Sequence, residues 1–354
     1  MRLTRLPIEI TTLLYLAMYM PYILITRYLT TTPDETLGRP FTGLEILPAT
    51  LILGLVMLVV FVWLSGWWRS AHRIRIGGWN VAGPTRWTFL SGIGTSLLLF
   101  TVPLSLTFEN VSIPFMQLLM RGDVLIIAPM VDLISGRRVR WYSWVALALV
   151  SVAMALTMWE RGGLHMPPLA IAAVVLYTVG YFMRLSVMTR VAKNGNEDAL
   201  RGYFVEEKIV GMPLAIVGLV LVTLSPLANQ GTELHWGFVE VWSSAAIWPL
   251  FWLAVVFTGI AVFAALILLD PRENTFCVPF ERAASILAGT AAAYVLAIFY
   301  GAPYPTRMEV IGMVLLIAAI ALLSLAPRWE AARAASVLGG VPVTGRESHG
   351  AKNA

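Results

Sequence analysis

IPFMQLLMRGDVLIIAPMVDLISG, residues 113–136, combines two properties that rarely occur together. The segment is long and apolar enough to cross a membrane as a helix, which takes about 20 predominantly apolar residues. Yet Arg121 and Asp123 lie in its middle. A charge at the centre of a membrane helix costs roughly 2.5–3.5 kcal/mol on insertion scales. We therefore expect these side chains to face a cavity or a partner rather than lipid.

The composition of the whole chain predicts a polytopic membrane protein. Of its 354 residues, 58% are hydrophobic and 13% are charged, whereas soluble domains carry about 25% charged residues. The mean hydropathy is +0.77, and apolar runs recur from end to end. The single cysteine, Cys277, excludes an internal disulfide. Paired histidines, HExxH and Gly-rich phosphate loops do not occur, so we expect neither a metal, nor a cofactor, nor an enzyme.

The apolar runs predict an all-α integral membrane protein with ten transmembrane helices. Arginine and lysine concentrate in the even-numbered loops, which places those loops and both termini in the cytoplasm. The N-terminal run lacks a small-residue cleavage site, so it is expected to stay as the first span. The predominance of arginine over lysine favours a bacterial plasma membrane. The ten expected spans are 6–27, 45–65, 87–107, 112–134, 141–159, 166–188, 207–226, 243–268, 277–299 and 307–326.

Two of these spans resemble each other at a constant offset of 165 residues. Residues 113–136 align with 278–301, so that Pro114 matches Pro279 and Gly136 matches Gly301. The two segments are the fourth and the ninth expected spans, and this offset of five gives them opposite directions through the membrane. The chain is thus predicted to form two inverted five-helix repeats, residues 1–160 and 161–326, an arrangement found in secondary transporters. Residues 327–354 are expected to be a disordered cytoplasmic tail, with room for a short amphipathic helix near 329–337.

QLLMRG, an apolar run and then GRRVRWYSWVALALVSVAMAL give the first repeat a family resemblance. This order is similar to nucleotide-sugar-transporter-like and EamA-like members of the drug/metabolite transporter superfamily. The resemblance implies alternating access around a central cavity lined by both halves. The span at 277–299 lacks the glycine- and lysine-containing signature of the better-known nucleotide-sugar carriers, which argues against such a substrate. The matching positions are Gln117, Met120, Arg121, Gly122, Gly136, Arg137, Arg138 and Trp144.

A polar stripe along the fourth span is the first candidate binding site. At 100° per residue, Gln117, Arg121 and Asp132 fall within about 60° of one another, whereas Asp123 points elsewhere. The Arg121 guanidinium suits an anionic substrate group, because its planar fork binds phosphate or carboxylate bidentately. The alternative is structural: Arg121 is held by Glu281, Asp123 or backbone carbonyls and joins two helices. Asp132 would line the same path.

Two further groups of polar residues carry alternatives of their own. Tyr177, Tyr181 and Arg184 share one side of the sixth span and could bind a substrate ring, or they form an interfacial belt with a positive-inside arginine. Glu281 is a candidate for proton coupling, because a desolvated glutamate holds its proton more tightly; Asp123 is a second one. Alternatively, Glu281 and its neighbour Arg282 form an ion pair at the membrane surface.

The sequence therefore predicts a secondary-active carrier of a small anionic or zwitterionic metabolite. A flippase of the same fold for a glycolipid or a polyprenyl phosphate is the main alternative, and an integral-membrane transferase is a weaker one. The expected partners are a small-molecule substrate and the lipid bilayer, with no nucleic acid. The sequence leaves a homodimer open.

Replacing Arg121 with alanine is expected to abolish substrate binding, because the proposed anchor for an anionic group is lost. Thermal unfolding of the purified protein would be measured with nucleotide sugars, phosphorylated metabolites, amino acids, organic cations and polyprenyl phosphates. A ligand at about 100 times its dissociation constant stabilises the protein by about 2.7 kcal/mol. A ligand-induced shift that persists in Arg121→Ala would make Arg121 a structural residue.

Overall fold

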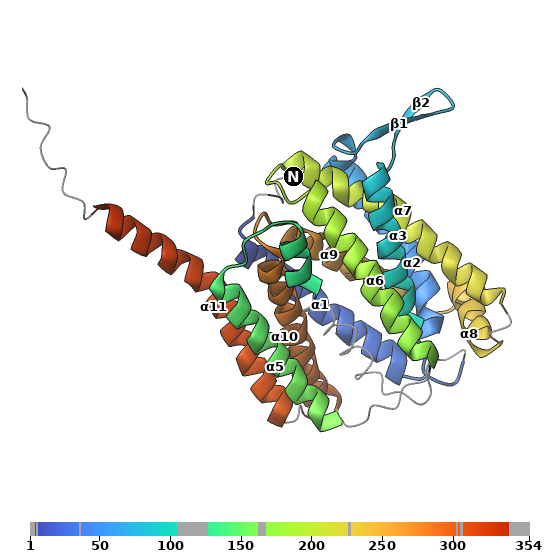
Figure 1. The fold of residues 1–354 in the computed structure, drawn as a ribbon. Coiled ribbons are helices and arrows are strands. Elements are labelled where there is room, and N and C mark those ends of the chain that lie inside the picture. Colours follow the sequence, from blue (N-terminus) through green and yellow to red (C-terminus); the bar gives the residue numbers. More distant parts are fainter. Residues whose placement is uncertain are drawn as a thin grey trace, which may run out of the picture.

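The computed structural model describes residues 4, 6–34, 37–104, 127–161, 168–225, 228–301, 304 and 307–339. Long helices pack side by side into one bundle, and a short hairpin projects from one end (Figure 1). The helices are α1 (Ile8–Thr31), α2 (Gly43–Ser65), α3 (Arg86–Leu104), α5 (Trp141–Arg161), α6 (Pro168–Val191), α7 (Glu197–Thr223), α8 (Ala228–Val239), α9 (Ile247–Leu268), α10 (Asn274–Tyr300) and α11 (Arg307–Gly339). Residues 127–134 are also helical.

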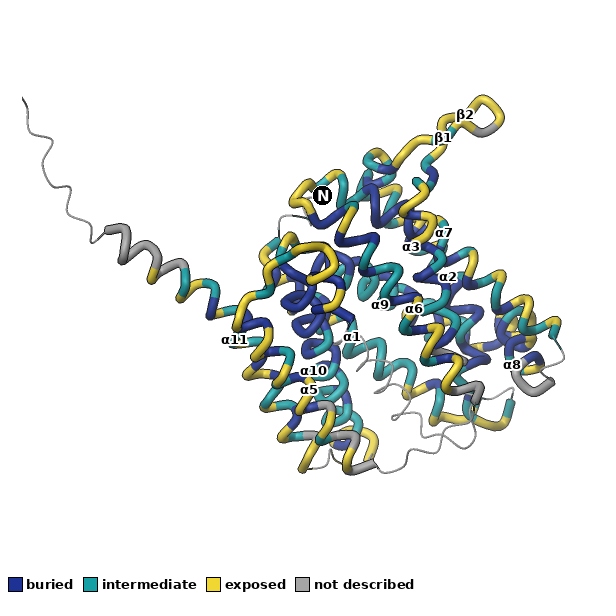
Figure 2. The backbone as a smooth tube through the Cα atoms, viewed as in Figure 1, coloured by how far each residue is buried: buried dark blue, intermediate teal, exposed yellow. Residues whose placement is uncertain are grey.

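The chain is a multi-pass membrane protein. Within the described residues, six helices are long and apolar enough to cross a membrane: α1, α2, α6, α9, α10 and α11. Large apolar side chains remain exposed on the outside of the bundle, such as Trp63 at 70% and Trp248 at 70%. Figure 2 shows exposed residues along the outer faces of the helices. Such a surface suits lipid, which offers no hydrogen bonds. Apolar side chains need none, and the backbone of a helix forms its hydrogen bonds within the helix.

Three local features differ from the sequence prediction. An antiparallel hairpin, β1 (Arg73–Ile76) and β2 (Trp79–Ala82), lies between α2 and α3, so the fold is not strictly all-α. The 12-residue helix α8 precedes α9 and is too short to cross a membrane. Helix α11 continues past Pro327 to Gly339, where a disordered tail was expected. Its last part projects away from the bundle in Figure 1.

Polar contacts join several helix ends at one end of the bundle. Thr4 donates to Glu197 at 2.8 Å, and Arg328 pairs with Glu9 at 3.0 Å. Arg140 pairs with Glu330 at 3.2 Å. These residues come from segments that the charge pattern assigned to the cytoplasm. The end of the bundle at which they meet is called the N-terminal end below.

The helices α3 and α9 occupy comparable central positions. Helix α3 packs against α6 and α7, and α9 packs against α1 and α2. Helices α5 and α11 pack against each other. The contact between α3 and α6 is close because glycines face each other: a Cβ on Gly94 would lie 2.6 Å from the carbonyl oxygen of Gly180. Small residues at such crossings let two backbones approach, as is common in membrane proteins.

Gly94→Ala is expected to destabilise the bundle by roughly 1–3 kcal/mol, because the new methyl group overlaps backbone that cannot move independently. Gly289→Ala on α10 is the matched control, since its Cβ would meet only Ile23 at an ordinary 3.8 Å. The control should leave the thermal midpoint unchanged or raise it, because alanine is the better helix former. Equal midpoints for the two variants in detergent unfolding would contradict the close crossing.

Candidate functional site

The structure separates the predicted site residues into three groups. Gln117, Arg121 and Asp123 lie outside the described residues. Asp132 lies at the N-terminal end of the bundle, against the start of α10. Tyr177, Tyr181 and Glu281 are buried deeper among the helices, together with Arg184, which shares a helix face with the two tyrosines, and with Glu207 and Lys208, which were not predicted as site residues.

Asp132 binds the first turn of α10. Its Oδ1 accepts from the backbone N–H of Asn274 at 2.9 Å and from the amide of that residue at 2.8 Å. Its Oδ2 accepts from the backbone N–H of Thr275 at 2.7 Å and from the hydroxyl at 2.8 Å. A helix start has unsatisfied N–H groups and a partial positive charge, so a carboxylate suits it well. Asp132 is fully buried, and in this conformation it offers no free oxygen to a substrate path.

Further polar bonds surround this contact and tie four segments together. Arg137 donates to the backbone carbonyls of Lys193 at 2.8 Å and Arg272 at 2.9 Å. The Lys193 ammonium donates to Asn274 at 3.1 Å, and Ser143 donates to Glu273 at 2.7 Å. These bonds hold four segments together at the N-terminal end: residues 132–137, the start of α5, the end of α6 and the start of α10.

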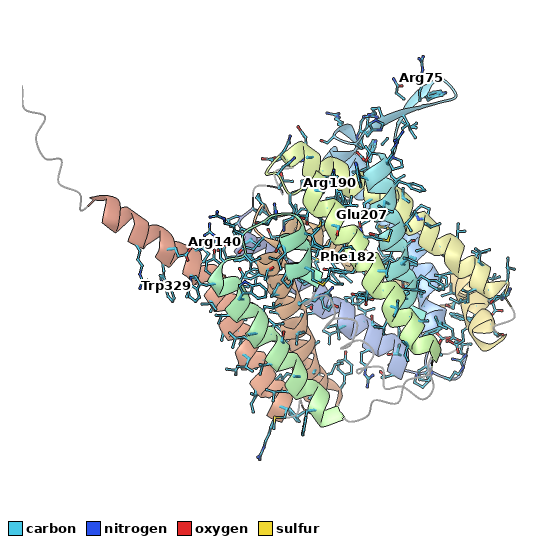
Figure 3. The ribbon with its side chains drawn as sticks, viewed as in Figure 1. Arg75, Arg140, Phe182, Arg190, Glu207 and Trp329 are labelled. Carbon is cyan, nitrogen blue, oxygen red and sulfur yellow. The ribbon has the colours of Figure 1, made fainter. Side chains whose placement is uncertain are left out.

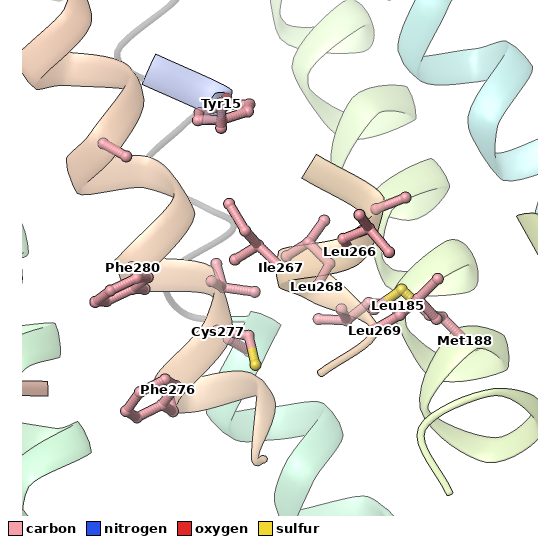
Figure 4. Close-up of a cluster of buried hydrophobic side chains, with 14 of the residues drawn as sticks. Tyr15, Leu185, Met188, Leu266, Ile267, Leu268, Leu269, Phe276, Cys277 and Phe280 are labelled. Atoms are coloured by element: carbon pink, nitrogen blue, oxygen red, sulfur yellow. The ribbon is translucent and has the colours of Figure 1, made fainter. Parts of the chain in front are cut away.

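A layer of apolar side chains lies next to these polar contacts. Cys277 on α10 lies on the side of the last turn of α9 and of Leu185 and Met188 on α6, whereas Phe276 and Phe280 point from α10 away from α9 (Figure 4). Phe276 packs against Tyr142 of α5. All of them are buried. Because these positions lie between the helix ends and the charged residues farther inside, the layer separates those charges from water at the N-terminal end.

Glu281 lies two turns inside α10 and belongs to a buried polar group. It is 5% exposed. Its Oε1 accepts from the Tyr15 hydroxyl of α1 at 2.5 Å, and its Oε2 lies 3.4 Å from Nε of Arg282. The expected pair of Glu281 with Arg282 is present, and helices enclose both side chains, so the pair does not reach water in this conformation. Proton coupling through Glu281 stays a prediction.

Tyr177 and Tyr181 stack on each other along α6, with ring centroids 6.2 Å apart. The Arg282 guanidinium lies 5.5 Å from the centroid of the Tyr181 ring, a distance at which cation and ring attract. Both tyrosines are buried. They thus face the interior of the bundle next to α10, and substrate binding by their rings stays a prediction.

An ion pair between α6 and α7 completes the charged region. Nε of Arg184 lies 2.6 Å from Oε1 of Glu207, which also accepts from the hydroxyl of Thr95 on α3. The ammonium of Lys208 lies 3.8 Å from the same oxygen. Glu207 is fully buried, and Figure 3 labels it within the packed helices.

Glu207 was not recognised as a site residue because the seventh span was expected to begin at that position. This boundary put the charges at the membrane surface. The helix begins at Glu197, where Asn196 caps it, so Glu207 lies ten residues inside, about 15 Å along the axis. The asparagine followed by two acidic residues, NED, is a helix-start signal that could have located this boundary.

We use the term ionic cluster for seven residues: Tyr15, Tyr181, Arg184, Glu207, Lys208, Glu281 and Arg282. They come from α1, α6, α7 and α10, and Tyr181 connects the two ion pairs, since it lies one turn from Arg184 and under Arg282. Charges in such an interior interact strongly because little water screens them. Within the described residues, no group of three or more metal-ligating side chains is found.

The chain shares its fold with solved protein structures. No family model matches the chain, and no curated protein matches it. Among solved structures, 27 chains match. One, described as "Crystal structure of protein", superimposes with a TM-score of 0.59 at 13% identity, covering 91% of this chain and 97% of its own. At this identity the likeness shows a shared fold, which extends over nearly the whole length of both chains.

Arg184→Gln is expected to destabilise the protein by roughly 3–5 kcal/mol, because Glu207 would keep a buried charge without its main partner. The double variant Arg184→Gln/Glu207→Gln should recover part of that loss, since two neutral amides can bond each other. The thermal midpoints of the single and double variants in detergent would be compared. Additive losses would mean that the two side chains do not depend on each other.

Proposed function

We propose that the protein is a secondary-active carrier that moves a small metabolite by alternating access between two inverted repeats. The observation that carries the proposal is the ionic cluster. Its charges lie inside a bundle whose outer surface is apolar, and ionisable residues in such positions are functional by default in membrane proteins. The charged residues all come from the second proposed repeat, and residues of the first repeat complete the site: Tyr15 donates to Glu281 and Thr95 donates to Glu207. Contributions from both halves are expected for a binding site at the repeat interface.

The packing of the helices supports the inverted repeat. If α8 is left aside, a shift of five spans relates α1, α2 and α3 to α6, α7 and α9. The shift converts the contact of α3 with α6 into that of α9 with α1, and the contact of α3 with α7 into that of α9 with α2. All four contacts are present. The same shift exchanges α5 with α11 and α2 with α7, so each of these two contacts should be its own counterpart. Both contacts are present.

The proposed fold has ten membrane crossings. By length and apolar composition, six of the described helices qualify as membrane spans, so four crossings must be argued in another way. Helix α7 illustrates the difference. Its 27 residues suffice to cross a bilayer, but its first half carries Glu206, Glu207 and Lys208, which lower the apolar character. These three side chains are buried against protein instead of lipid, so they are no obstacle to insertion.

The described conformation fits a carrier that is closed toward the cytoplasm. Asp132, Arg137 and Lys193 join helices of both proposed repeats at that end, and the apolar layer lies beneath them. The cavity that borders Tyr181 and Arg184 is too small for a water molecule. In the proposed cycle, these contacts separate when the cluster opens to the cytoplasm.

Cysteine accessibility tests the proposal without knowledge of the substrate. Single cysteines would be introduced in a Cys277→Ala background. Met188→Cys places one on α6 at the cytoplasmic side of Arg184, and Ala173→Cys places one at the opposite side. Both native side chains are buried. Alternating access predicts that a membrane-impermeant maleimide labels each cysteine from its own side of the membrane only. Labelling would be measured in vesicles of both orientations.

Val175→Cys is the matched control on the same helix. Val175 is 53% exposed on the outer surface, so its cysteine should face lipid and stay unlabelled from both sides. Labelling of Met188→Cys and Ala173→Cys from one and the same side, or labelling of neither, would contradict a carrier.

A further inference from the structure

The hairpin β1–β2 carries positive charge with no negative charge beside it in the sequence. Residues 66–86, which join α2 to α3, contain four arginines and no aspartate or glutamate. Arg73 and Arg75 on β1 are exposed, and among the described residues neither has a carboxylate partner. Arg69 and Arg73 lie over the ring of Trp68, at 5.5 and 4.8 Å from its centroid. The charges of this segment are therefore available to an anionic partner.

The register of the hairpin separates its arginines from its apolar side chains. Arg75 pairs with Asn80 across the hairpin, and the next pair is Ile74 with Val81. Residues directly opposite each other share a face, and neighbours along a strand alternate between the two faces. One face therefore carries both arginines of β1. The opposite face carries Ile74, Val81 and Trp79.

The described protein leaves the apolar face of the hairpin largely open. Trp79 is 78% exposed and Val81 is 38% exposed, and Figure 1 shows the hairpin clear of the helices. A two-stranded hairpin is marginally stable in water unless its hydrophobic face is packed against something. A surface that is basic on one side and carries tryptophan on the other suits the boundary between lipid headgroups and acyl chains.

Helix α7 holds the base of the hairpin beside the membrane helices. Glu206 accepts from the backbone N–H of His72 at 2.8 Å and from that of Thr85 at 3.3 Å. Ser70 donates to Asp198 at 2.9 Å. Each strand has four residues and spans about 13 Å. The hairpin thus stays close to the headgroups that surround the ends of α2 and α3.

Exposed tryptophans place the membrane surface at the same level. Trp63 in the last turn of α2 is 70% exposed, and Trp87 at the start of α3 is 46% exposed. Tryptophan is enriched at the interface between membrane and water. The charge pattern assigns this side to the cytoplasm, and the cytoplasmic leaflet carries anionic lipids that attract basic segments next to membrane helices.

We propose that the hairpin lies on the cytoplasmic leaflet and binds anionic phospholipids. Arg73 and Arg75 pair with lipid phosphates, and Trp79 and Val81 pack against the upper part of the acyl chains. An acidic protein would match the arginines alone, whereas the lipid surface beside the hairpin supplies both the anionic and the apolar partner. The inference does not rest on transport, so it holds or fails separately from the carrier function.

Lipid titration tests the arginines. The thermal midpoint of the full-length protein in an uncharged detergent would be followed while dioleoylphosphatidylglycerol or dioleoylphosphatidylcholine is added. We expect the apparent affinity for phosphatidylglycerol to be higher by about tenfold or more and to fall with added salt. Arg75→Gln should weaken it about fivefold, the usual effect of one basic residue near an anionic surface.

Arg138→Gln is the matched control for the loss of one charge. Arg138 is also exposed and lies at the same end of the bundle, but outside the hairpin. Its replacement should leave the affinity for phosphatidylglycerol close to that of the unchanged protein. Equal effects of Arg75→Gln and Arg138→Gln, or equal affinity for the two lipids, would overturn the proposal.

A fluorescent probe tests the position of the apolar face. In a Cys277→Ala background, Trp79→Cys would be labelled with nitrobenzoxadiazole, whose emission moves to shorter wavelength in apolar surroundings. In phosphatidylglycerol nanodiscs we expect this shift, and Arg73→Gln/Arg75→Gln should reduce it. Asn194→Cys, in the exposed loop before α7, is the control and should emit as in water.

The outcomes separate this inference from the proposed function. A probe at position 79 that emits as in water in phosphatidylglycerol nanodiscs would overturn the lipid contact and leave the carrier standing. A shifted probe together with failure of two-sided cysteine labelling on α6 would support the lipid contact and overturn the carrier.

Discussion

The ion pair between Arg184 and Glu207 is the contact on which the interior of this protein depends. Two charges removed from water are tolerated only when each compensates the other and further hydrogen bonds complete their shells. Thr95 and Lys208 contribute to that compensation, and the arrangement therefore specifies how α3, α6 and α7 meet. Glu281 and Arg282 apply the same constraint to α10 and, through Tyr15, to α1. Yet the compensation is incomplete, since oxygens of both glutamates lack a hydrogen bond within the described residues. A purely structural pair would be expected to satisfy them, and this is why the cluster is better explained as a binding site.

The N-terminal end of the bundle shows how such a site can be kept dry. Asp132 uses all of its accessible hydrogen-bonding capacity on the first turn of α10, and Arg137 and Lys193 extend that contact to α6 and to the loop before α10. The apolar layer that includes Cys277, Leu185 and Met188 lies between these bonds and the ionic cluster. Asp132 and Lys193 are buried in this conformation, but they lie at the ends of helices, where water reaches them once those ends separate. A closure made of such bonds can therefore open while the cluster beneath it stays paired, and this matches the cycle proposed for a carrier.

Much of the fold could be predicted from the sequence, and the errors have specific causes. Apolar runs locate helices because a membrane helix must be apolar along its length, and α2 and α9 follow their expected spans closely. The hairpin at residues 73–82 was missed because two four-residue strands give a weak pattern beside neighbouring arginines. The start of α7 was misplaced because its first half is polar yet buried. Gln117, Arg121 and Asp123, on which the predicted site relied, lie outside the described residues, so their roles stay predictions.

The sequence by itself determined the membrane environment, the helical composition and the alternation of charge between loops, because these follow from local composition and from the cost of unpaired polar groups in lipid. It also identified Tyr177, Tyr181 and Glu281 as polar residues in unusual positions. Only the tertiary structure decided which of these residues meet. Arg184 and Glu207 lie 23 positions apart, and Tyr15 and Glu281 lie 266 apart, so no periodicity within one helix relates them. Their proximity follows from how the helices pack, and the unpaired atoms that suggest a ligand exist only in that packing.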